Sequence, residues 1–322
     1  MTRTFLIDTD TASDDAVALI MALRSKEVRV AAITVVAGNV DVSQATRNAL
    51  YAAELCGSDV PIFSGAEKPL ARPLINASWF HGMDGLGDHG YAPKKRRAES
   101  QHGVDALIQT VVAHPGIEMV TLGPLTNVAL AISREPRIVE CVKRCVVMGG
   151  APCCEGNITP AAEFNIFVDP EAARAVFHSG LLIEMVGWQL SRGEAVLNQG
   201  DINRVLALKN PLAEFAIRCN DTALEGYFKQ TGERGISLPD PVAMSIALNP
   251  ALCTESSEHH MEVETSSELT RGMTVVDRLN ASADPRNRET WSTALKKRKT
   301  HICWTLDIAG WKAALFSALR GT

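Results

Sequence analysis

The fold is decided by residues 5–20, which read FLIDTDTASDDAVALI. Four carboxylates follow the first three apolar residues within eight positions: Asp8, Asp10, Asp14 and Asp15. The apolar run 5–7 predicts a buried parallel strand. Residues 16–23 predict the first helix, capped by Ser13 or Asp14. The carboxylates are therefore expected at the carboxyl end of a strand, where open α/β sheets bind ligands.

Four acids that converge in one buried place repel one another, and a divalent cation would remove that repulsion. A donor set made only of oxygens suits calcium or magnesium better than zinc. Acidic residues are also common at helix starts, because they cap amides and complement the helix dipole. Capping explains Asp14 or Asp15, but it does not explain all four carboxylates.

The segment Asp8-Thr9-Asp10-Thr11 also matches the Asp-x-Asp-x-Thr start of haloacid-dehalogenase-type phosphatases, in which the first Asp is a nucleophile assisted by magnesium. That mechanism needs a downstream Lys and a second acidic metal motif, and no segment offers them convincingly. A short motif alone is weak evidence, so this alternative stays remote.

The rest of the chain alternates strand-like and helix-like segments, which predicts one α/β domain over 1–322 with a Rossmann-like, mainly parallel central sheet and flanking helices. Polar side chains follow two predicted strands at the carboxyl edge of the sheet: Asn39, and then Thr126 and Asn127. Glu163 and Asn165 precede the helix that Asp169 starts, and helix capping does not explain them. Asn39 has an alternative role as a turn residue, and Asn127 has one as a helix cap. Asp169, before Pro170, is mostly a helix cap.

Two further segments bear on the site. Residues 72–93 form a long loop with glycines and aromatics around His81, which suits a flap over a site, with a structural loop as the alternative. Residues 211–227 predict one helix, and Asp240 stands just before a helix that begins at Pro241.

The composition narrows the class of protein. The net charge is −5, and the two basic runs, 94–97 and 296–299, are short, so we expect no nucleic-acid partner. No apolar stretch reaches bilayer length, and the first strand starts too early for a signal peptide, so we expect no membrane partner. The eight cysteines lack Cys-x-x-Cys spacing, which favours reduced thiols and a cytoplasmic location.

These residues resemble the inosine–uridine-preferring nucleoside hydrolase family. The first loop resembles the family's Asp-x-Asp-x-x-x-Asp-Asp signature, and the likeness continues in order through nearly the whole chain. The later segments are Gly38-Asn39, His81-Gly-x-Asp-Gly-Leu-Gly87, Gly123-Pro-Leu-Thr-Asn127, Met148-Gly-Gly-Ala151, Ala162-Glu-Phe-Asn165, Asp169-Pro-Glu-Ala-Ala173 and Asp240-Pro-Val-Ala243.

The resemblance implies a site for calcium and ribose. Calcium would be held by Asp10, Asp15, the Thr126 main-chain carbonyl and Asp240. Asp10 would also act as general base for the attacking water, while Asp8 supports the metal shell or contacts ribose. The remaining substrate contacts implied are Asp14, Asn39, Met148, Glu163, Phe164 and Asn165. Clustered carboxylates suit the oxocarbenium-like state of N-glycosidic cleavage.

One position departs from the family pattern. Many relatives carry a His immediately before the last metal-binding Asp, where it can protonate the leaving base, and this chain has Pro239. His81 is a candidate replacement acid, with a structural hydrogen bond as the alternative. An aromatic wall could raise the basicity of the base instead; its candidates are Trp79, Phe80, Phe164, Trp188, Tyr227 and Phe228.

The sequence thus predicts a calcium-dependent hydrolase that releases ribose and a free base, with purine nucleosides preferred because N7 accepts a proton more readily than uracil does. The alternatives are a hydrolase of another N-ribosyl compound and a calcium-dependent ribose-binding protein without turnover. The expected partners are a small-molecule nucleoside and further copies of the chain in a homodimer or homotetramer.

Overall fold

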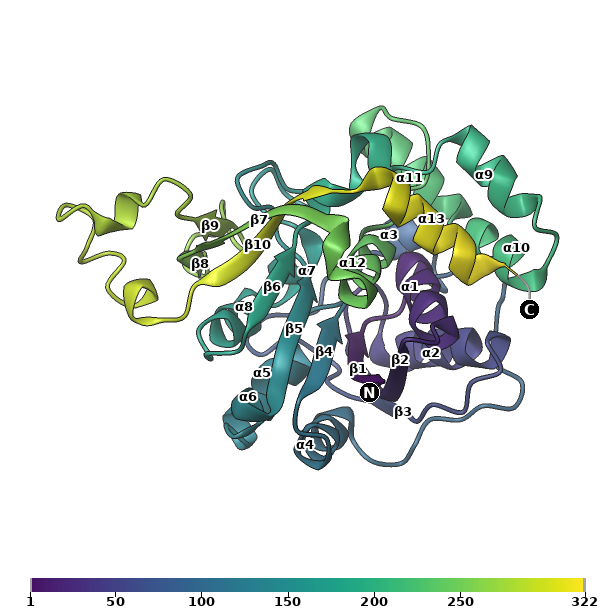
Figure 1. Cartoon of the computed structure of the whole chain (residues 1–322), viewed down its shortest axis with the longest axis horizontal. Helices are drawn as coiled ribbons and strands as arrows, with labels where there is room; N and C mark the ends of the chain where they lie inside the picture. The colour runs from purple at the N-terminus through teal and green to yellow at the C-terminus, as the bar shows by residue number, and fades with distance from the viewer. Residues whose placement is uncertain (1, 321–322) are drawn as a thin grey trace.

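An eight-stranded sheet runs through the middle of the computed structural model, which describes residues 2–320 (Figure 1). Its strand order is β3-β2-β1-β4-β5-β6-β10-β7, with β7 antiparallel to β10 and the other neighbours parallel. The sheet strands are β1 Arg3–Thr9, β2 Val28–Val35, β3 Ile62–Ser64, β4 Ile117–Thr121, β5 Val142–Met148, β6 Ile183–Val186, β7 Cys253–His259 and β10 Thr300–Leu306. A separate antiparallel pair, β8 Met261–Val263 and β9 Thr274–Val276, lies on the arm at the left of Figure 1. The prediction of an α/β fold with a mainly parallel, Rossmann-like sheet is confirmed.

Helices cover both faces of the sheet (Figure 1). The α-helices are α1 Ser13–Arg24, α2 Val42–Leu55, α3 Ser78–His81, α4 Gly103–Ala113, α5 Thr126–Arg134, α6 Ile138–Cys141, α7 Phe164–Val168, α8 Pro170–Phe177, α9 Gln199–Leu206, α10 Pro211–Arg218, α11 Asp221–Thr231, α12 Pro239–Leu248 and α13 Ile308–Leu319. The 3₁₀ helices are η1 Trp188–Ser191, η2 Gly193–Ala195, η3 Pro250–Leu252, η4 Ala281–Ala283 and η5 Ala294–Lys296.

Strand β1 is buried on both sides, which explains its unbroken apolar run. Phe5 and Ile7 belong to the core formed with α1, α2, α12 and α13, whereas Leu6 belongs to the core formed with α4, α5 and α8. Side chains alternate between the faces of a strand, so consecutive apolar residues supply both cores at once. The two cores fix β1, and with it the acidic loop that follows.

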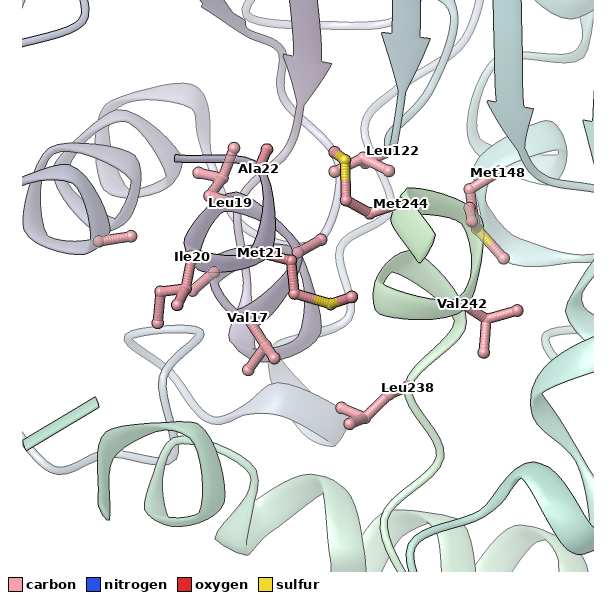
Figure 2. Packing of buried hydrophobic residues seen from close by; sticks show 14 of the residues in the cluster. Val17, Leu19, Ile20, Met21, Ala22, Leu122, Met148, Leu238, Val242 and Met244 are labelled. Carbon is pink, nitrogen blue, oxygen red and sulfur yellow. The ribbon is translucent and has the colours of Figure 1, made fainter. Parts of the chain in front are cut away.

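Helix α1 is enclosed by the rest of the protein along most of its length. All residues from Ser13 to Ala22 are buried, and α1 packs against α12. Figure 2 shows Met21 pointing from α1 toward α12, and Met21 and Met244 of α12 belong to the same buried cluster. The predicted cap was wrong, because the N-cap residue is Ala12 and Ser13 already lies in the helix. The Asp15 carboxylate satisfies the Ala12 N–H instead, at 2.9 Å.

The strand order places a crevice between β1 and β4. The chain winds outward from β1 through β2 and β3, and then resumes on the other side of β1 through β4, β5 and β6. Adjacent connections therefore leave the sheet on opposite faces, and ligands bind at the carboxyl ends of the strands at such a point. Asp10 follows β1 and Gly123 follows β4, so both stand at this crevice.

Two arginines hold the carboxyl end of α12. Arg3 donates hydrogen bonds to the carbonyls of Ala247 and Leu248 at 2.6 and 2.8 Å. Arg144 donates to the carbonyls of Ile246 and Ala247 at 3.3 and 3.2 Å. Two acids hold these arginines in turn. Glu118 pairs with both, at 2.5 Å from Arg3 and 3.5 Å from Arg144, and Glu184 lies 2.6 Å from Arg144. Cations at this end also complement the helix dipole.

Three predicted segments differ from the structure. The helix predicted over 211–227 is broken at Cys219 and Asn220 into α10 and α11. The long loop 72–93 contains the short helix α3. Helix α12 begins at Pro239, two residues before the predicted start, so Asp240 lies in its first turn. Within residues 2–320, none of the helices combines the length and apolarity that crossing a bilayer requires.

Candidate active site

Three carboxylates meet at the crevice between β1 and β4. Oxygens of Asp14, Asp15 and Asp240 lie within 4.8 Å of one another, and all three residues are buried. Asp14 and Asp15 come from the first turn of α1, and Asp240 comes from the first turn of α12. The packing of α1 against α12 therefore joins acids from opposite ends of the sequence.

Asp10 lies beside this group in a space that side chains would close. A Cβ atom at Gly38 would lie 2.0 Å from Asp10 Oδ2, and one at Gly123 would lie 2.6 Å from Asp10 Oδ1. The Asn39 N–H donates to Asp10 Oδ2 at 2.7 Å. The glycines after β2 and β4 thus leave room for the Asp10 carboxylate between two loops. The sequence predicted Gly38 only as a residue of a tight turn, and the structure adds that a side chain there would collide with Asp10.

Several oxygens of this group lack hydrogen-bond partners. Over residues 2–320, buried side-chain atoms without a partner include Asp10 Oδ1, Asp14 Oδ1 and Asp240 Oδ1. Buried carboxylate oxygens are costly when nothing pairs with them, and a hard divalent cation with oxygen ligands would pair with all three. The donor set therefore fits a metal ion of the calcium or magnesium type.

Burial and mutual repulsion raise the pKa values of the clustered acids. Burial and the charge of Asp15 raise the pKa of Asp10 well above its usual value. Burial and the charges of Asp15, Asp14 and Asp10 do the same to the pKa of Asp240. Burial raises the pKa of Asp14 and that of Asp15 to about 6. Without a cation the cluster therefore holds protons at acidic pH.

Asp15 and Asp8 are tied down by neighbouring side chains. Thr9 donates to Asp15 Oδ1 at 2.6 Å, and Thr34 donates to Asp8 Oδ1 at 2.5 Å. Asn127 donates to the same Asp8 oxygen at 2.8 Å and accepts a hydrogen bond from Ala66 N–H. Asn127 is inside α5, so its alternative role as a cap is wrong. Burial, opposed by these hydrogen bonds, raises the pKa of Asp8 to about 7.

Thr126 is the first residue of α5, and it is buried. Its hydroxyl donates to Asp169 Oδ2 at 2.6 Å. Asp169 also accepts from Ala172 N–H at 3.0 Å, so it caps α8 as the sequence predicted. Thr126 is therefore fixed in place by the cap of a neighbouring helix, and its role as a carbonyl ligand stays a prediction.

Glu163 and Asn165 belong to α7, which the sequence did not reveal. Glu163 is its N-cap, and its carboxylate accepts backbone N–H groups of Gly150, Asn165 and Ile166 at 2.7, 2.9 and 3.3 Å. Burial nevertheless raises the pKa of Glu163 to about 7. The Asn165 amide nitrogen donates to the Leu122 carbonyl at 2.9 Å, which orients the side chain between β4 and β5.

A partly open pocket lies next to the acids, and Asp14 and Asp240 belong to its lining. Five of the six candidate aromatic residues line it: Trp79, Phe80, Phe164, Trp188 and Tyr227. Phe228 lies elsewhere, with the Arg234 guanidinium 4.5 Å from its ring centre. Five other residues predicted to contact substrate line the pocket: Asp14, Asn39, Met148, Glu163 and Asn165. Asp8, the alternative ribose contact, is not among the lining residues. An apolar wall facing a few polar groups is typical of a small-molecule site.

His81 ends α3 and faces the same pocket. Its Nδ1 lies 2.8 Å from the Ser13 hydroxyl and 3.8 Å from Asp14 Oδ1. Burial lowers the pKa of His81 to about 4, so the imidazole is neutral at pH 7. The loop 72–93 thus brings a histidine to the site, as expected for a flap residue.

The fold and the site define an α/β enzyme that binds a small ligand above a cluster of acids, and the comparisons specify its class. Residues 5–312 match the model of the inosine-uridine preferring nucleoside hydrolases, and the chain belongs to that family. It is accordingly an enzyme of the class that hydrolyses ribonucleosides, and the resemblance found in the sequence is confirmed.

Individual relatives span most of the chain. The inosine-uridine preferring nucleoside hydrolase of Leishmania major is 37% identical over 86% of this chain and 88% of its own length. The pyrimidine-specific ribonucleoside hydrolase RihA of Shewanella sp. strain MR-7 is 38% identical over 89% of this chain and 90% of its own. The solved structure of a plant nucleoside hydrolase superposes with a TM-score of 0.92 at 30% identity and covers 100% of both chains.

Proposed function

We propose that this enzyme uses calcium to hydrolyse purine ribonucleosides to ribose and a free base. The observation that carries the proposal is the set of buried, unpartnered carboxylate oxygens of Asp10, Asp14 and Asp240, within residues 2–320, beneath an aromatic pocket. The pocket needs a ligand that offers polar groups at one end and a flat apolar group at the other. A ribonucleoside has that construction.

The ion would be held by Asp10, Asp15, Asp240 and the Thr126 carbonyl, as in the predicted set, and Asp14 lies close enough to Asp15 and Asp240 to share it. When bound, calcium would orient ribose hydroxyls and acidify a water. The all-oxygen donor set supports calcium or magnesium, and the crowding of acids from separate elements suits the larger, more flexible coordination of calcium.

The chain's own residues would then perform the reaction. Asp10 accepts one N–H from Asn39 through Oδ2, which leaves Oδ1 as the acceptor for a proton from the attacking water. Asp14, Asn39 and Asn165 line the ribose end and can hold its hydroxyls. Glu163 accepts three backbone N–H groups, which fix its carboxylate in the pocket lining and leave a free lone pair on Oε1 for a ribose hydroxyl.

Departure of the base needs help from a residue other than the one at position 239. Pro239 lines the pocket where relatives carry a His, and Pro has no proton to give. His81 is neutral at pH 7, so it can donate a hydrogen bond to a base but is a weak acid. Stacking by Trp188 and Tyr227 would help a purine accept a proton from water, which supports a purine preference.

The same feature supports a second candidate substrate class. An N-ribosyl compound whose leaving group departs without protonation would not need the acid that Pro239 replaces. Both candidates keep the same ribose site and the same Asp10 base, and they differ in the leaving group alone.

A reducing-sugar assay over inosine, guanosine, adenosine, uridine and cytidine tests the proposal. The enzyme is stripped with a chelator, assayed, and assayed again after calcium or magnesium is restored. We expect release of ribose from purine nucleosides that disappears with the chelator and returns with calcium. No ribose from any nucleoside would reject the nucleoside proposal, and a faster rate with uridine than with inosine would reject the purine preference.

A further inference from the structure

The pocket has two chemically different ends. Asp14, Asn165 and Asp240 mark the end at the sheet, where ribose is proposed to bind. Another part of the lining is formed by η1 and by the segment that leads into α12. A nucleoside that places its ribose at the acids would extend its base away from them, toward lining residues such as these.

Two serines lie on that wall. Ser191 ends η1 and is buried, and Ser237 precedes α12 and is partly buried. The segment before Ser237 is fixed by a β-bridge, in which Leu197 and Ile236 exchange two backbone hydrogen bonds of 3.0 and 3.1 Å. The position of Ser237 is therefore set by the backbone on its amino side and by α12 on its carboxyl side.

The hydroxyl protons of the pair are both donated to other atoms of the protein. Ser191 donates to the Trp188 carbonyl at 2.8 Å. Ser237 directs its single proton at the Ser191 carbonyl and hydroxyl oxygens, at 3.0 and 3.1 Å. A serine hydroxyl has one proton and two acceptor lone pairs, so Ser237 offers its lone pairs to a ligand in the pocket.

We propose that Ser237 accepts a hydrogen bond from an N–H group on the edge of the leaving base, and so selects nucleosides whose base carries such a group. The proposal rests on the proposed nucleoside hydrolase function and names a specificity residue for it. Inosine offers its ring N1–H. Purine riboside has the same ring system, but its N1 carries no proton and is an acceptor. The Ser237 lone pairs would then face a lone pair of the base and make no hydrogen bond with it.

The test compares inosine and purine riboside with the wild type and with Ser237→Ala. The wild type should favour inosine in kcat/KM, and Ser237→Ala should lower the ratio of inosine to purine riboside by about threefold to tenfold, as expected for one neutral hydrogen bond. The change should lie mostly in KM, because the base edge is far from the bond that breaks and the contact exists before the transition state.

Two further variants separate specificity from folding. Ser237→Thr keeps the hydroxyl and should keep the wild-type ratio, even if its absolute rate falls. Ser245→Ala is the matched control, because Ser245 is a buried serine of α12 whose hydroxyl donates to the Val242 carbonyl at 2.7 Å, outside this pocket. It should leave the ratio unchanged.

The possible failures are distinguishable. If the wild type hydrolyses neither nucleoside, the proposed function fails and this inference falls with it. If both are hydrolysed but Ser237→Ala slows them equally, the proposed function stands and Ser237 is merely structural. If Ser237→Ala slows purine riboside selectively, Ser237 is a donor, and the inference is wrong.

Discussion

Replacing the Asp10 carboxylate with an amide should stop turnover without unfolding the protein. In Asp10→Asn, the Asn39 N–H that now donates to Oδ2 at 2.7 Å still needs an acceptor. The new side chain must therefore turn its carbonyl oxygen to Asn39 and its NH₂ group to the place of Oδ1, since Gly38 and Gly123 leave little room for another orientation. A donor would then stand where the attacking water needs a base.

The expected loss of kcat is about 10²–10⁴-fold, the usual contribution of a general base, or about 3–5 kcal/mol of transition-state stabilisation. Stability should not fall. Burial and the charge of Asp15 already raise the pKa of Asp10, so a neutral amide relieves repulsion in the protein without calcium. We therefore expect a melting temperature in chelator that equals or exceeds that of the wild type.

The assay pairs ribose release with calorimetric titration of ribose in the presence of calcium. The matched control is Asp41→Asn at the N-cap of α2, where Asn caps as well as Asp. A variant that keeps its rate within about tenfold of the wild type, roughly 1.4 kcal/mol, would refute the role of Asp10 as base. Loss of ribose binding in parallel with kcat would show that Asp10 mainly builds the site.

Three other outcomes follow from the same structure. Arg144→Met should lower the melting temperature by several degrees and raise the calcium concentration needed for activity. The control Arg134→Met removes an exposed ion pair and should change neither quantity. Equal effects of the two variants would contradict the importance of the α12 contacts. Burial raises the pKa of Asp14 and Asp15 to about 6, so the folded metal-free protein takes up protons as pH falls, and its stability decreases as pH rises from about 4 through 6. One fixed calcium concentration, about 100 times the dissociation constant at pH 7.5, should stabilise the protein by about 2.7 kcal/mol at that pH and by less at pH 5, where protons compete for the acids. Scanning calorimetry that finds a larger rise in melting temperature at pH 5 would contradict the raised pKa values. His81→Ala should slow inosine more than uridine if His81 assists purine departure, and kcat/KM values lowered by the same factor would remove that role.

Much of the fold was readable because its signals are local. The apolar run before Asp8 and the helical pattern after Asp15 predicted β1 and α1, and their order along the chain predicted the parallel sheet. The helix cap was missed for a tertiary reason. Ser13 is a good cap by type, but its hydroxyl is 2.8 Å from His81 Nδ1, a residue far away in the sequence, and the helix starts one residue earlier with Ala12 as its N-cap.

Other features were hidden because they depend on where separate segments meet. The apolar pattern of 211–227 runs unbroken through the bend at Asn220, whose side chain donates to the Ala216 carbonyl at 3.0 Å. The acids were recognised individually, but only the packing of α1 on α12 shows that Asp14 joins Asp15 and Asp240. The direction of the Ser237 hydroxyl has no trace in the sequence, because it is set by a carbonyl 46 positions away.

The meeting of α1 and α12 also has a consequence for how the protein is made. The acids on α1 are synthesised near the start of the chain, while Asp240 and the helix that carries it emerge much later. Until α12 docks, a growing chain carries Asp14 and Asp15 of the cluster but lacks Asp240. Pairings between distant segments form slowly. The complete cluster of acids therefore forms only on chains in which α12 has docked on α1, after strands β1 to β6 have been synthesised.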